Sequence, residues 1–334
     1  MLENFYIKRI RMHNAKTVIK LLLLSLVLLS FQACSIKIPV DTPKASQESY
    51  TAGDNTNELN VKFESTLSQE HSVAVGKRTG VFKLKHQGDD INANAFIKAA
   101  LEKELAARKI PMQFVTGTDN SLSLDHFEIL THRVSGFSPL VTLTTLQVKI
   151  DKDGQANTFV SMVKKAKTPV WSMVEVNEPC YNEPTTLIVK EIVAKINKHY
   201  FDYKLSDAQV QTLKEKITAN EQPKLTYLDI YELGFSNNKS ALEFLKTLTT
   251  SSDEYTRLAA ISSIGTLGGA DDLDFLVALN KNSAVWQDRV MVLKSIGDLN
   301  TQESMMYLKE RKEVLQGADS MESEWSLKII GLYL

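Results

Sequence analysis

Arg257-Leu-Ala-Ala-Ile-Ser-Ser-Ile-Gly-Thr-Leu-Gly268 is the stretch that decides the fold of the C-terminal part of this chain. It contains a short unit, an aliphatic residue, two variable residues, a second aliphatic residue and glycine. The unit occurs four times with its glycines 31, 32 and 34 residues apart, closing at Leu233-Gly234, Ile264-Gly265, Ile296-Gly297 and Ile330-Gly331. Self-similarity at such a period is typical of a solenoid of helical hairpins.

A second apolar set follows each of the first three glycines at the same period. Its members are Leu242, Phe244 and Leu245, then Leu273, Phe275 and Leu276, then Met305, Tyr307 and Leu308. One hairpin cannot bury its apolar stripe alone, so neighbouring hairpins must stack. We therefore predict an all-α superhelical array over residues 225–334, with Ile296 buried and with Gly265 and Gly297 letting the next helix come close.

Residues 257–268 closely resemble the short HEAT-like repeats first named for phycobilin lyases, and the likeness covers residues 225–334. The resemblance implies a scaffold of stacked helix pairs. It implies no lyase chemistry, because many unrelated proteins share the repeat.

Residues 59–200 predict an α+β domain that precedes the array. Leu59, Val61 and Phe63 alternate as in a strand, and residues 140–150 place every second side chain on one face. Ile97, Leu101 and Leu105 form a helical stripe, and a second helix starts at Glu183-Pro184 with the stripe of Leu187/Ile188, Ile192 and Ile196. Two amphipathic helices and a meander of strands form a two-layer sandwich.

This domain resembles the YajG-type lipoprotein family in the run Ala99-Ala100-Leu101-Glu102-Lys103-Glu104-Leu105-Ala106-Ala107-Arg108 and in the closing Ile192-Val193-Ala194-Lys195-Ile196 helix. The resemblance covers roughly 120 residues. It implies a fold and a place in the cell envelope more than an activity. Residues 201–224 are predicted to be a helical linker, cleavable by protease, between two independently folding parts.

The first 33 residues predict a lipoprotein signal peptide. Five basic groups precede the apolar run Leu21–Leu29, and Ala33-Cys34 follows. The run is shorter than the about 20 residues that span a bilayer as a helix. Ala33-Cys34 resembles the lipobox of bacterial lipoproteins, which implies acylation of Cys34, for example with palmitate. Ser35 in place of Asp implies delivery to the outer membrane.

The segment from the anchor to the first domain, residues 34–58, is rich in Ser, Thr, Asp and Asn and shows no periodicity. We interpret it as a flexible tether. Without residues 1–33 the chain has 34 basic and 39 acidic groups, a net charge of −5. A mildly acidic body gives no electrostatic basis for binding nucleic acid or anionic lipid headgroups.

Four groups of residues could suggest chemistry, and for each a structural interpretation is preferred. Asp151-Lys-Asp153-Gly154 is predicted to be a turn and not a calcium loop, because Met162 occupies the place of the distal glutamate. His126 and His132 would lie about 20 Å apart along a strand, too far to share a metal. Cys180 is predicted to be a buried thiol, with an intermolecular partner or a nucleophile as alternatives. Tyr227, Tyr231 and Phe235 are predicted to be repeat core and not a ligand cage.

The sequence therefore predicts a periplasmic, outer-membrane-anchored adaptor or scaffold that binds an unknown envelope protein through its repeats, with no catalytic residue, cofactor or metal. Lys246, Asp274, Asn280 and Lys294 are expected to lie on the surfaces of the array, but the sequence does not identify them as binding residues. Two alternatives remain. A deep polar pocket at residues 160–230 would favour an envelope hydrolase or lyase, and a large apolar cavity in the α+β domain would favour a carrier of small molecules or glycans.

Overall fold

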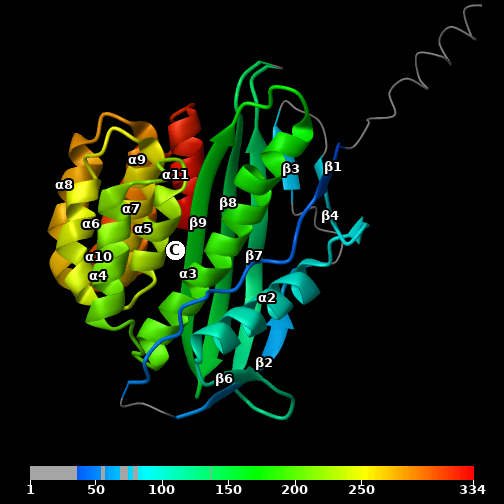
Figure 1. The fold of residues 1–334 in the computed structure, drawn as a ribbon, viewed down its shortest axis with the longest axis vertical. Helices are drawn as coiled ribbons and strands as arrows, with labels where there is room; N and C mark the ends of the chain where they lie inside the picture. The colour runs from blue at the N-terminus through cyan, green and yellow to red at the C-terminus, as the bar shows by residue number, and fades with distance from the viewer. Residues whose placement is uncertain (1–35, 54–56, 68–73, 78–81, 136) are drawn as a thin grey trace, which may run out of the picture.

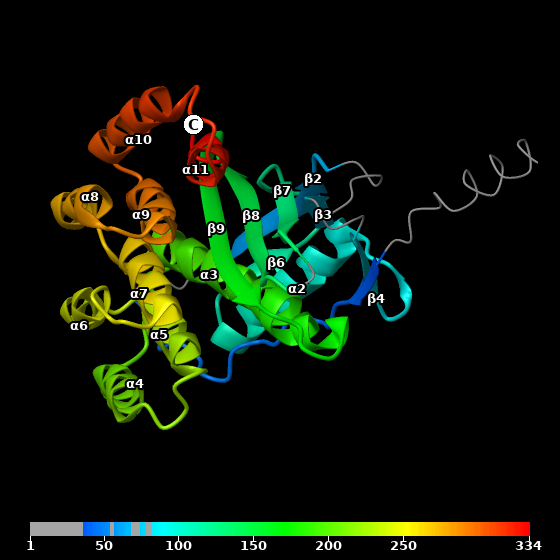
Figure 2. The same ribbon diagram turned by 90° about the horizontal axis from the view of Figure 1, so that it is seen from above.

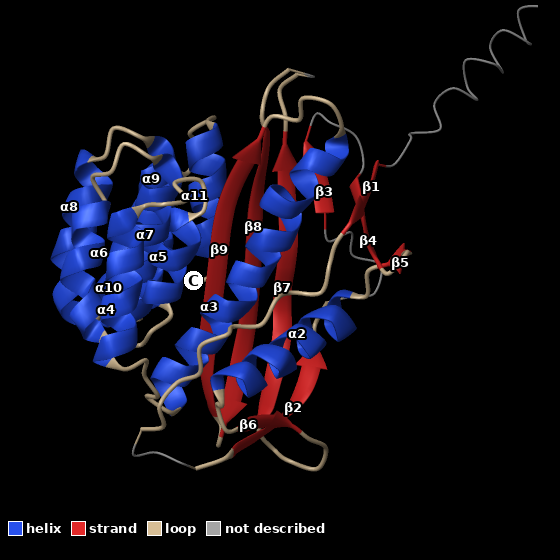
Figure 3. Ribbon diagram, in the orientation of Figure 1, coloured by secondary structure: helices blue, strands red, loops and turns tan. Residues whose placement is uncertain are grey.

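The computed structural model describes residues 36–53, 57–67, 74–77, 82–135 and 137–334. An α+β region comes first and an all-α region follows, as the sequence predicted (Figure 3). A long sheet stands at the centre, two helices cross one of its faces, and the remaining helices lie beside its edge (Figure 1). The predicted signal peptide and Cys34 lie outside the described residues.

The main sheet has the order β6-β2-β7-β8-β9, and β3 also pairs with β7. Its strands are β2 (Leu59–Ser65), β3 (Ala74–Lys77), β6 (Met112–Phe114), β7 (Ser121–His132), β8 (Leu140–Lys152) and β9 (Gln155–Lys167). β7, β8 and β9 form an antiparallel meander, whereas β2 runs parallel to β7. A small second sheet contains β1 (Ile36–Pro39), β4 (Phe82–His86) and β5 (Asp89–Asp90).

The turn between β8 and β9 is the one predicted at Asp151–Gly154. Asp153 and Gly154 both have positive φ, 54° and 78°, as a two-residue hairpin turn requires. The backbone N–H of Gly154 donates to the Asp151 carboxylate at 3.1 Å. These contacts account for the acidic residues of the motif, so its interpretation as a turn is confirmed.

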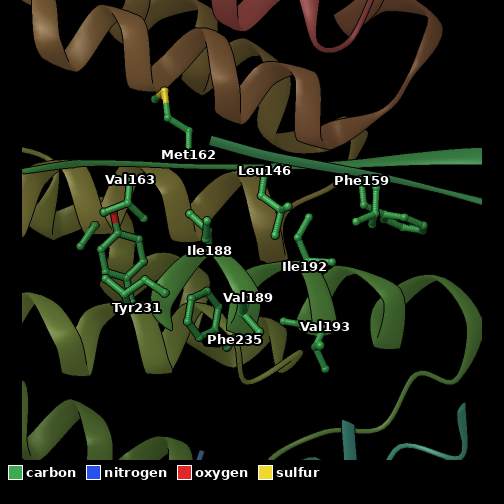
Figure 4. Close-up of a cluster of buried hydrophobic side chains, with 14 of the residues drawn as sticks. Leu146, Phe159, Met162, Val163, Ile188, Val189, Ile192, Val193, Tyr231 and Phe235 are labelled. Atoms are coloured by element: carbon green, nitrogen blue, oxygen red, sulfur yellow. The ribbon is translucent and has the colours of Figure 1, made fainter. Parts of the chain in front are cut away.

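Two helices cover one face of the sheet, which confirms the two-layer prediction. They are α2 (Ala93–Arg108) and α3 (Glu183–Tyr200). Leu146 of β8 and Phe159 of β9 point toward α3, where Ile188 and Ile192 meet them (Figure 4). Met162 points to the opposite side of β9, toward the helical array (Figure 4). The edge strand of the sheet is therefore covered on both faces.

The helical array has two layers. The outer helices are α4 (Asp207–Ala219), α6 (Leu242–Leu248), α8 (Leu273–Asn282) and α10 (Gln302–Leu315). The inner helices are α5 (Thr226–Gly234), α7 (Glu254–Leu267) and α9 (Trp286–Leu299), and α11 (Met321–Gly331) closes the array. Seen from above, the outer helices fan out around the inner ones, which face α3 and β9 (Figure 2).

Close approach of the inner helices explains two of the repeated glycines. A Cβ on Gly234 would lie 2.9 Å from the Cα of Ser263, and a Cβ on Gly265 would lie 2.6 Å from the Cα of Ser295. The hydroxyl of Ser295 donates to the carbonyl of Ile261 across the same contact at 2.8 Å. The predicted role of Gly265 is confirmed.

Gly297 also leaves room for a neighbour, which is the ring of Tyr333 at 2.7 Å from a Cβ placed there. The neighbour is thus a side chain beyond the end of α11 and not the backbone of a helix.

A repeated arginine joins successive hairpins. Nε of Arg257 lies 2.9 Å from a carboxylate oxygen of Asp288, and Arg289 makes a two-nitrogen contact with the carboxylate of Glu322 at 2.6 and 2.7 Å. Both arginines also donate to the carbonyl of a serine six residues earlier. The contacts between successive hairpins therefore repeat with the same period as the sequence.

The prediction that residues 34–58 form a flexible tether is wrong for residues 37–53, which pack on the domain. Ile38, Val40 and Tyr50 are each at most 4% exposed. The carboxylate of Glu104 on α2 accepts from the backbone N–H of Ser46 at 2.8 Å and from its hydroxyl at 2.6 Å. The polar composition led to the wrong prediction because the polar groups of this segment form hydrogen bonds with residues far along the chain.

The prediction of two independently folding parts also disagrees with the structure, because one apolar core runs through both. Phe201, Tyr203 and Leu205 of the predicted linker are buried, and α4 packs on α5 as the first outer helix. The Tyr255 hydroxyl accepts from the backbone N–H of Ala166 and donates to its carbonyl, both at 2.9 Å. The array thus covers the backbone of the edge strand β9.

Among the described residues, no helix is both long enough and apolar enough to cross a membrane.

Candidate functional site at the junction of sheet and repeats

A polar pocket of about 570 Å³ opens where β9, α3 and the C-terminal ends of α7 and α9 meet. Both parts of the chain line it: residues 156–160, Lys195, Lys198 and His199 from the first, and Thr266, residues 297–300, Met305 and Tyr333 from the second. Nothing in the local sequence of either part alone forms this pocket. It exists because the array is docked on the sheet.

Behind the pocket lies a buried network of charges centred on Glu191 of α3, which is fully buried. Its carboxylate contacts the ammonium of Lys195 at 2.7 Å and that of Lys294 on α9. The hydroxyl of Ser161 on β9 donates to it at 2.5 Å, and that of Thr266 on α7 at 3.2 Å. One carboxylate therefore joins the helix layer, the sheet and two repeats.

Asp298 of α9 is the second acidic member of the network. It receives Lys195 at 2.6 Å, Lys294 at 2.8 Å and the hydroxyl of Tyr333 at 2.6 Å. Two carboxylates and two ammonium groups balance each other, as buried charges must. Burial raises the pKa of Glu191, but Lys195 and Lys294 outweigh that effect and hold its pKa below the usual range. Burial and the nearby Asp298 carboxylate raise the pKa of Tyr333.

Lys198 and His199 form the more accessible wall of the pocket. Nζ of Lys198 donates to the carbonyls of Thr266 and Gly268 at 2.8 and 2.6 Å, so it binds the C-terminal end of α7. Burial lowers the pKa of Lys198 to about 8 and also lowers that of His199. The His199 ring lies edge-on to Phe159, with ring centres 5.8 Å apart.

The arrangement is suited to binding more than to proton transfer. Lys195 already donates to the carbonyl of Val160 at 2.5 Å besides its two carboxylates, and Thr266 is held by Glu191. A general base needs a reacting group within hydrogen-bond reach, and these side chains are occupied by one another. The polar side chains that line the pocket outside this network are those of Lys198, His199, Asn157, Thr158 and Asn300.

Of the two histidines considered as metal ligands, His126 lies 3.9 Å from one carboxylate, that of Glu128. His126 contacts the hydroxyl of Thr145 at 2.8 Å, and burial lowers the pKa of its ring. His132 is six positions further along the same strand, β7. No group of three or more His, Cys, Asp or Glu side chains in the described part of the chain could hold a metal ion.

Cys180 is a free, buried thiol, as the sequence predicted. Burial raises the pKa of its thiol to about 12, so it stays protonated at neutral pH. A protonated thiol is a poor nucleophile and a poor metal ligand. With no exposed surface it also offers nothing to an intermolecular disulfide.

The aromatic residues in α5 and directly after it are core, as predicted. Tyr227 and Tyr231 are each 3% exposed, and Phe235 is 1% exposed. Tyr231 and Phe235 lie beside Ile188 and Val189 of α3 (Figure 4). They therefore fill the seam between the helix layer and the array.

Two of the four residues expected on the surface of the array are buried. Lys294 is fully buried in the charge network, and Asn280 is buried with its amide donating to the carbonyl of Arg289 at 3.0 Å. Asp274 is exposed on α8. Lys246 lies between Glu243 and Asp272 at 2.9 and 3.0 Å, which ties α6 to the turn before α8.

Sequence reasoning missed Glu191, Lys195 and Asp298. Each belongs to a pair of opposite charges four residues apart on a helix, the pattern of an exposed helix face. The sequence did contain one signal that such charged residues are buried, their position beside apolar residues of the buried stripes. Glu191 directly precedes Ile192, and Lys294 directly follows Leu293.

Comparison with known proteins identifies the array. No curated protein matches the chain. One solved structure to which it is similar, described as the crystal structure of an uncharacterized protein, has 10% sequence identity and a TM-score of 0.31 over 48% of this chain and 99% of that one. A likeness this distant carries no conclusion about fold or function. Residues 210–297 match the family model of HEAT repeats, which agrees with the α4–α9 hairpins and makes the helical region a HEAT-like array.

Proposed function

We propose that this chain is a protein-binding scaffold whose working surface is the outer layer of its HEAT-like array. The observation that carries the proposal is the division of the array into two layers. The inner helices bury their surfaces against each other, α3 and β9, whereas α6, α8 and α10 each bury one face. Solenoids present extended surfaces on which residues outside the packing stripes are free to serve recognition.

A groove is found at the first hairpin of the array, where an outer helix meets an inner one. It lies between α4 and α5, has a volume of about 550 Å³ and includes Leu225 and Leu228. Leu225 is 42% exposed. Lys216 and Asp229, joined at 2.7 Å, and Glu215 form its charged border. An apolar floor with a charged rim suits a helical or extended protein segment that carries apolar side chains.

The place of action proposed here is the periplasmic face of the outer membrane, with acyl groups on Cys34 as the anchor. Support comes from the basic residues, the apolar run and the Ala33-Cys34 pair of the sequence. Replacement of Cys34 by Ser should release the protein from the membrane fraction, and unchanged fractionation would contradict the anchor. The proposed role is binding and not catalysis.

A second candidate function is binding of a small polar molecule in the junction pocket. An ammonium has three donors, and two of those of Lys198 are used by the carbonyls of α7, which leaves one for a ligand. This pocket is the feature closest to the one that would favour an envelope enzyme. Its wall is however completed by the array and not by residues 160–230 alone.

Photo-crosslinking in the native envelope tests the scaffold proposal. A photoreactive residue is placed at Asp274 on α8 or at Met306 on α10, both exposed, and at exposed Lys103 on α2 as the matched control. We expect the same partner band from the two outer-layer positions and none from Lys103. A partner that crosslinks equally from all three positions, or from Lys103 alone, would refute the outer layer as the binding surface.

A further inference from the structure

One end of the main sheet carries an unusual concentration of exposed apolar side chains, which we name the apolar tip. It consists of Val134, Phe137, Val170, Trp171 and Val174. Phe137 is 97% exposed and Trp171 is 92% exposed. Scattered apolar residues on a surface are ordinary, but a cluster that contains two almost fully exposed aromatic rings is typical of an interaction site.

Both loops of the tip are held in shape by side chains. The carboxylate of Glu175 accepts from the backbone N–H groups of Val170, Trp171 and Ser172 at 3.1, 2.6 and 3.0 Å. These bonds lower the pKa of Glu175 and keep it charged. The loop that carries Trp171 is therefore closed around a fixed anion, and the ring is displayed outside it.

The neighbouring loop is built in the same way around Ser138. Its hydroxyl accepts from the backbone N–H groups of Val134 and Ser135 at 3.1 and 2.8 Å and donates to the carbonyl of Ser135 at 2.9 Å. Phe137 is displayed by this turn. An exposed ring on a preformed loop loses little conformational freedom when it binds.

The two loops are adjacent. Leu140 at the start of β8 pairs with Lys167 at the end of β9, so the loops leave the same end of the sheet (Figure 1). A guanidinium nitrogen of Arg133 lies 3.8 Å from the sulfur of Met173 and links them. The tip is thus one surface with Arg133 and Lys167 at its base.

The first described strand starts at this same end (Figure 1). The backbone N–H of Asp41 donates to Asn182 at 3.0 Å, and Lys44 pairs with Glu178 at 2.9 Å. The chain therefore runs along the turn that follows the Trp171 loop. Cys34 is two residues before Ile36, and two residues span at most about 7 Å.

We infer that the apolar tip inserts into the surface of the lipid bilayer to which Cys34 anchors the chain. The inference rests on the anchor proposed above. Because residues 37–53 pack on the domain, the anchor leaves little slack and holds the sheet end that bears the tip against the membrane. Tryptophan and phenylalanine favour the bilayer interface, and Arg133 and Lys167 are placed to stay among the headgroups.

The bilayer is preferred to a protein partner because the tip is two protruding loops and not a groove or a flat face. Both loops project from the end of the sheet in Figure 1. A lipid surface accepts protruding rings without a matching pocket. Insertion also fixes the orientation of the outer helices relative to the membrane.

Quenching of tryptophan fluorescence by brominated lipid tests this inference. The mature lipidated protein is purified from its own membrane and reconstituted into phosphatidylcholine vesicles with brominated acyl chains. The other two tryptophans, Trp286 and Trp325, lie in the helical array, where their ring centres are 5.4 Å apart. Their fluorescence therefore does not report on the apolar tip. We expect strong quenching in the parent and loss of that quenching in Trp171→Phe.

Two further variants sharpen the test. Phe137→Ser should weaken the quenching of Trp171, whereas Met306→Ser, which removes an exposed apolar side chain from α10, should not. No quenching of the parent, or equal quenching of Trp171→Phe, would overturn the inference, and so would a crosslink of position 171 to protein in place of lipid. The anchor is judged separately by the fractionation of Cys34→Ser, so failure of the tip inference can be told apart from failure of the anchor.

Discussion

The inner and outer helices of the array come from the same repeat yet are buried very differently. On α7 every residue from Leu258 to Leu267 is buried, whereas on α8 only Leu276 and Asn280 are. The inner layer extends the core of the α+β domain, and the outer layer is a one-sided amphipathic surface. The difference shows that a solenoid joined to a sheet buries one layer of helices in the joint and leaves the other layer exposed on one face.

The two helices of the α+β domain repeat this difference. α2 covers the sheet with one face, while α3 lies between the sheet and the inner helices. Ile188 and Ile192 of α3 meet the sheet, and Glu191 and Lys195 meet the array. A helix packed on both sides has no solvent face, so its charged residues must pair inside the protein.

Removal of Glu191 should have the largest effect on the inner layer. Glu191→Ala leaves the ammonium groups of Lys195 and Lys294 buried with less compensation, which costs about 3–5 kcal/mol. Urea unfolding of the purified variant measures the loss. The control Glu310→Ala, on the exposed face of α10, should stay within about 0.5 kcal/mol of the parent. Equal effects of the two substitutions would contradict the buried network.

Truncation of Ile296 should come next. The side chain is fully buried on α9, so Ile296→Ala should cost about 2–5 kcal/mol. Two independently folding parts would give one weakened and one unchanged thermal transition. Because the core is continuous, the structure leads us to expect a single transition at lower temperature. Val314→Ala on α10, where the side chain is 66% exposed, is the matched control.

An added methyl group at Gly265 should cost less. Gly265→Ala pushes α7 from α9, because the new Cβ would lie 2.6 Å from the Cα of Ser295, and overpacking of this kind costs about 1–3 kcal/mol. Gly269→Ala meets nothing within 4 Å and is the control. The urea denaturation midpoints of the two variants and the parent measure this loss of stability. If both variants match the parent, the helices are not in close contact.

The smallest expected effect concerns Lys198 and pH. Burial lowers its pKa to about 8 in the folded protein, below the 10.5 of an unperturbed lysine. Between these two pKa values the unfolded chain holds a proton that the folded protein has lost. The free energy of unfolding therefore rises as pH increases from about 8 to 10, and Lys198 causes no such rise below pH 8. The gain in urea midpoint over this window should shrink in Lys198→Met. An identical pH dependence of parent and variant would contradict the burial.

The sequence predicted the elements better than their docking. Periodicity identified α2, α3, the β8–β9 hairpin and the repeat, since each is encoded within a few turns or strands. Residues 37–53 were misjudged because their partners, such as Glu104 and Asn182, lie far along the chain. Their polar side chains are typical of a loop whether that loop is free or bound.

The candidate site was beyond sequence reasoning for the same cause. Its charged residues come from α3 and α9, about 100 positions apart, and no local pattern states that Glu191 and Lys294 meet. What the sequence did predict is that Cys180 is a buried thiol and that Asp151–Gly154 is a turn. The apolar tip was missed as well, because single aromatic residues in loops carry no period.

Hydrogen exchange along a urea series, read by mass spectrometry on the mature protein, tests most directly whether sheet and array form one unit. Peptides from β8 and β9 report on the sheet, and peptides from α7 and α9 report on the inner helices. The shared core and the Glu191 network predict that both sets lose protection at the same urea concentration. Loss of protection in α7 and α9 at a lower urea concentration, with the sheet still protected, would contradict the account.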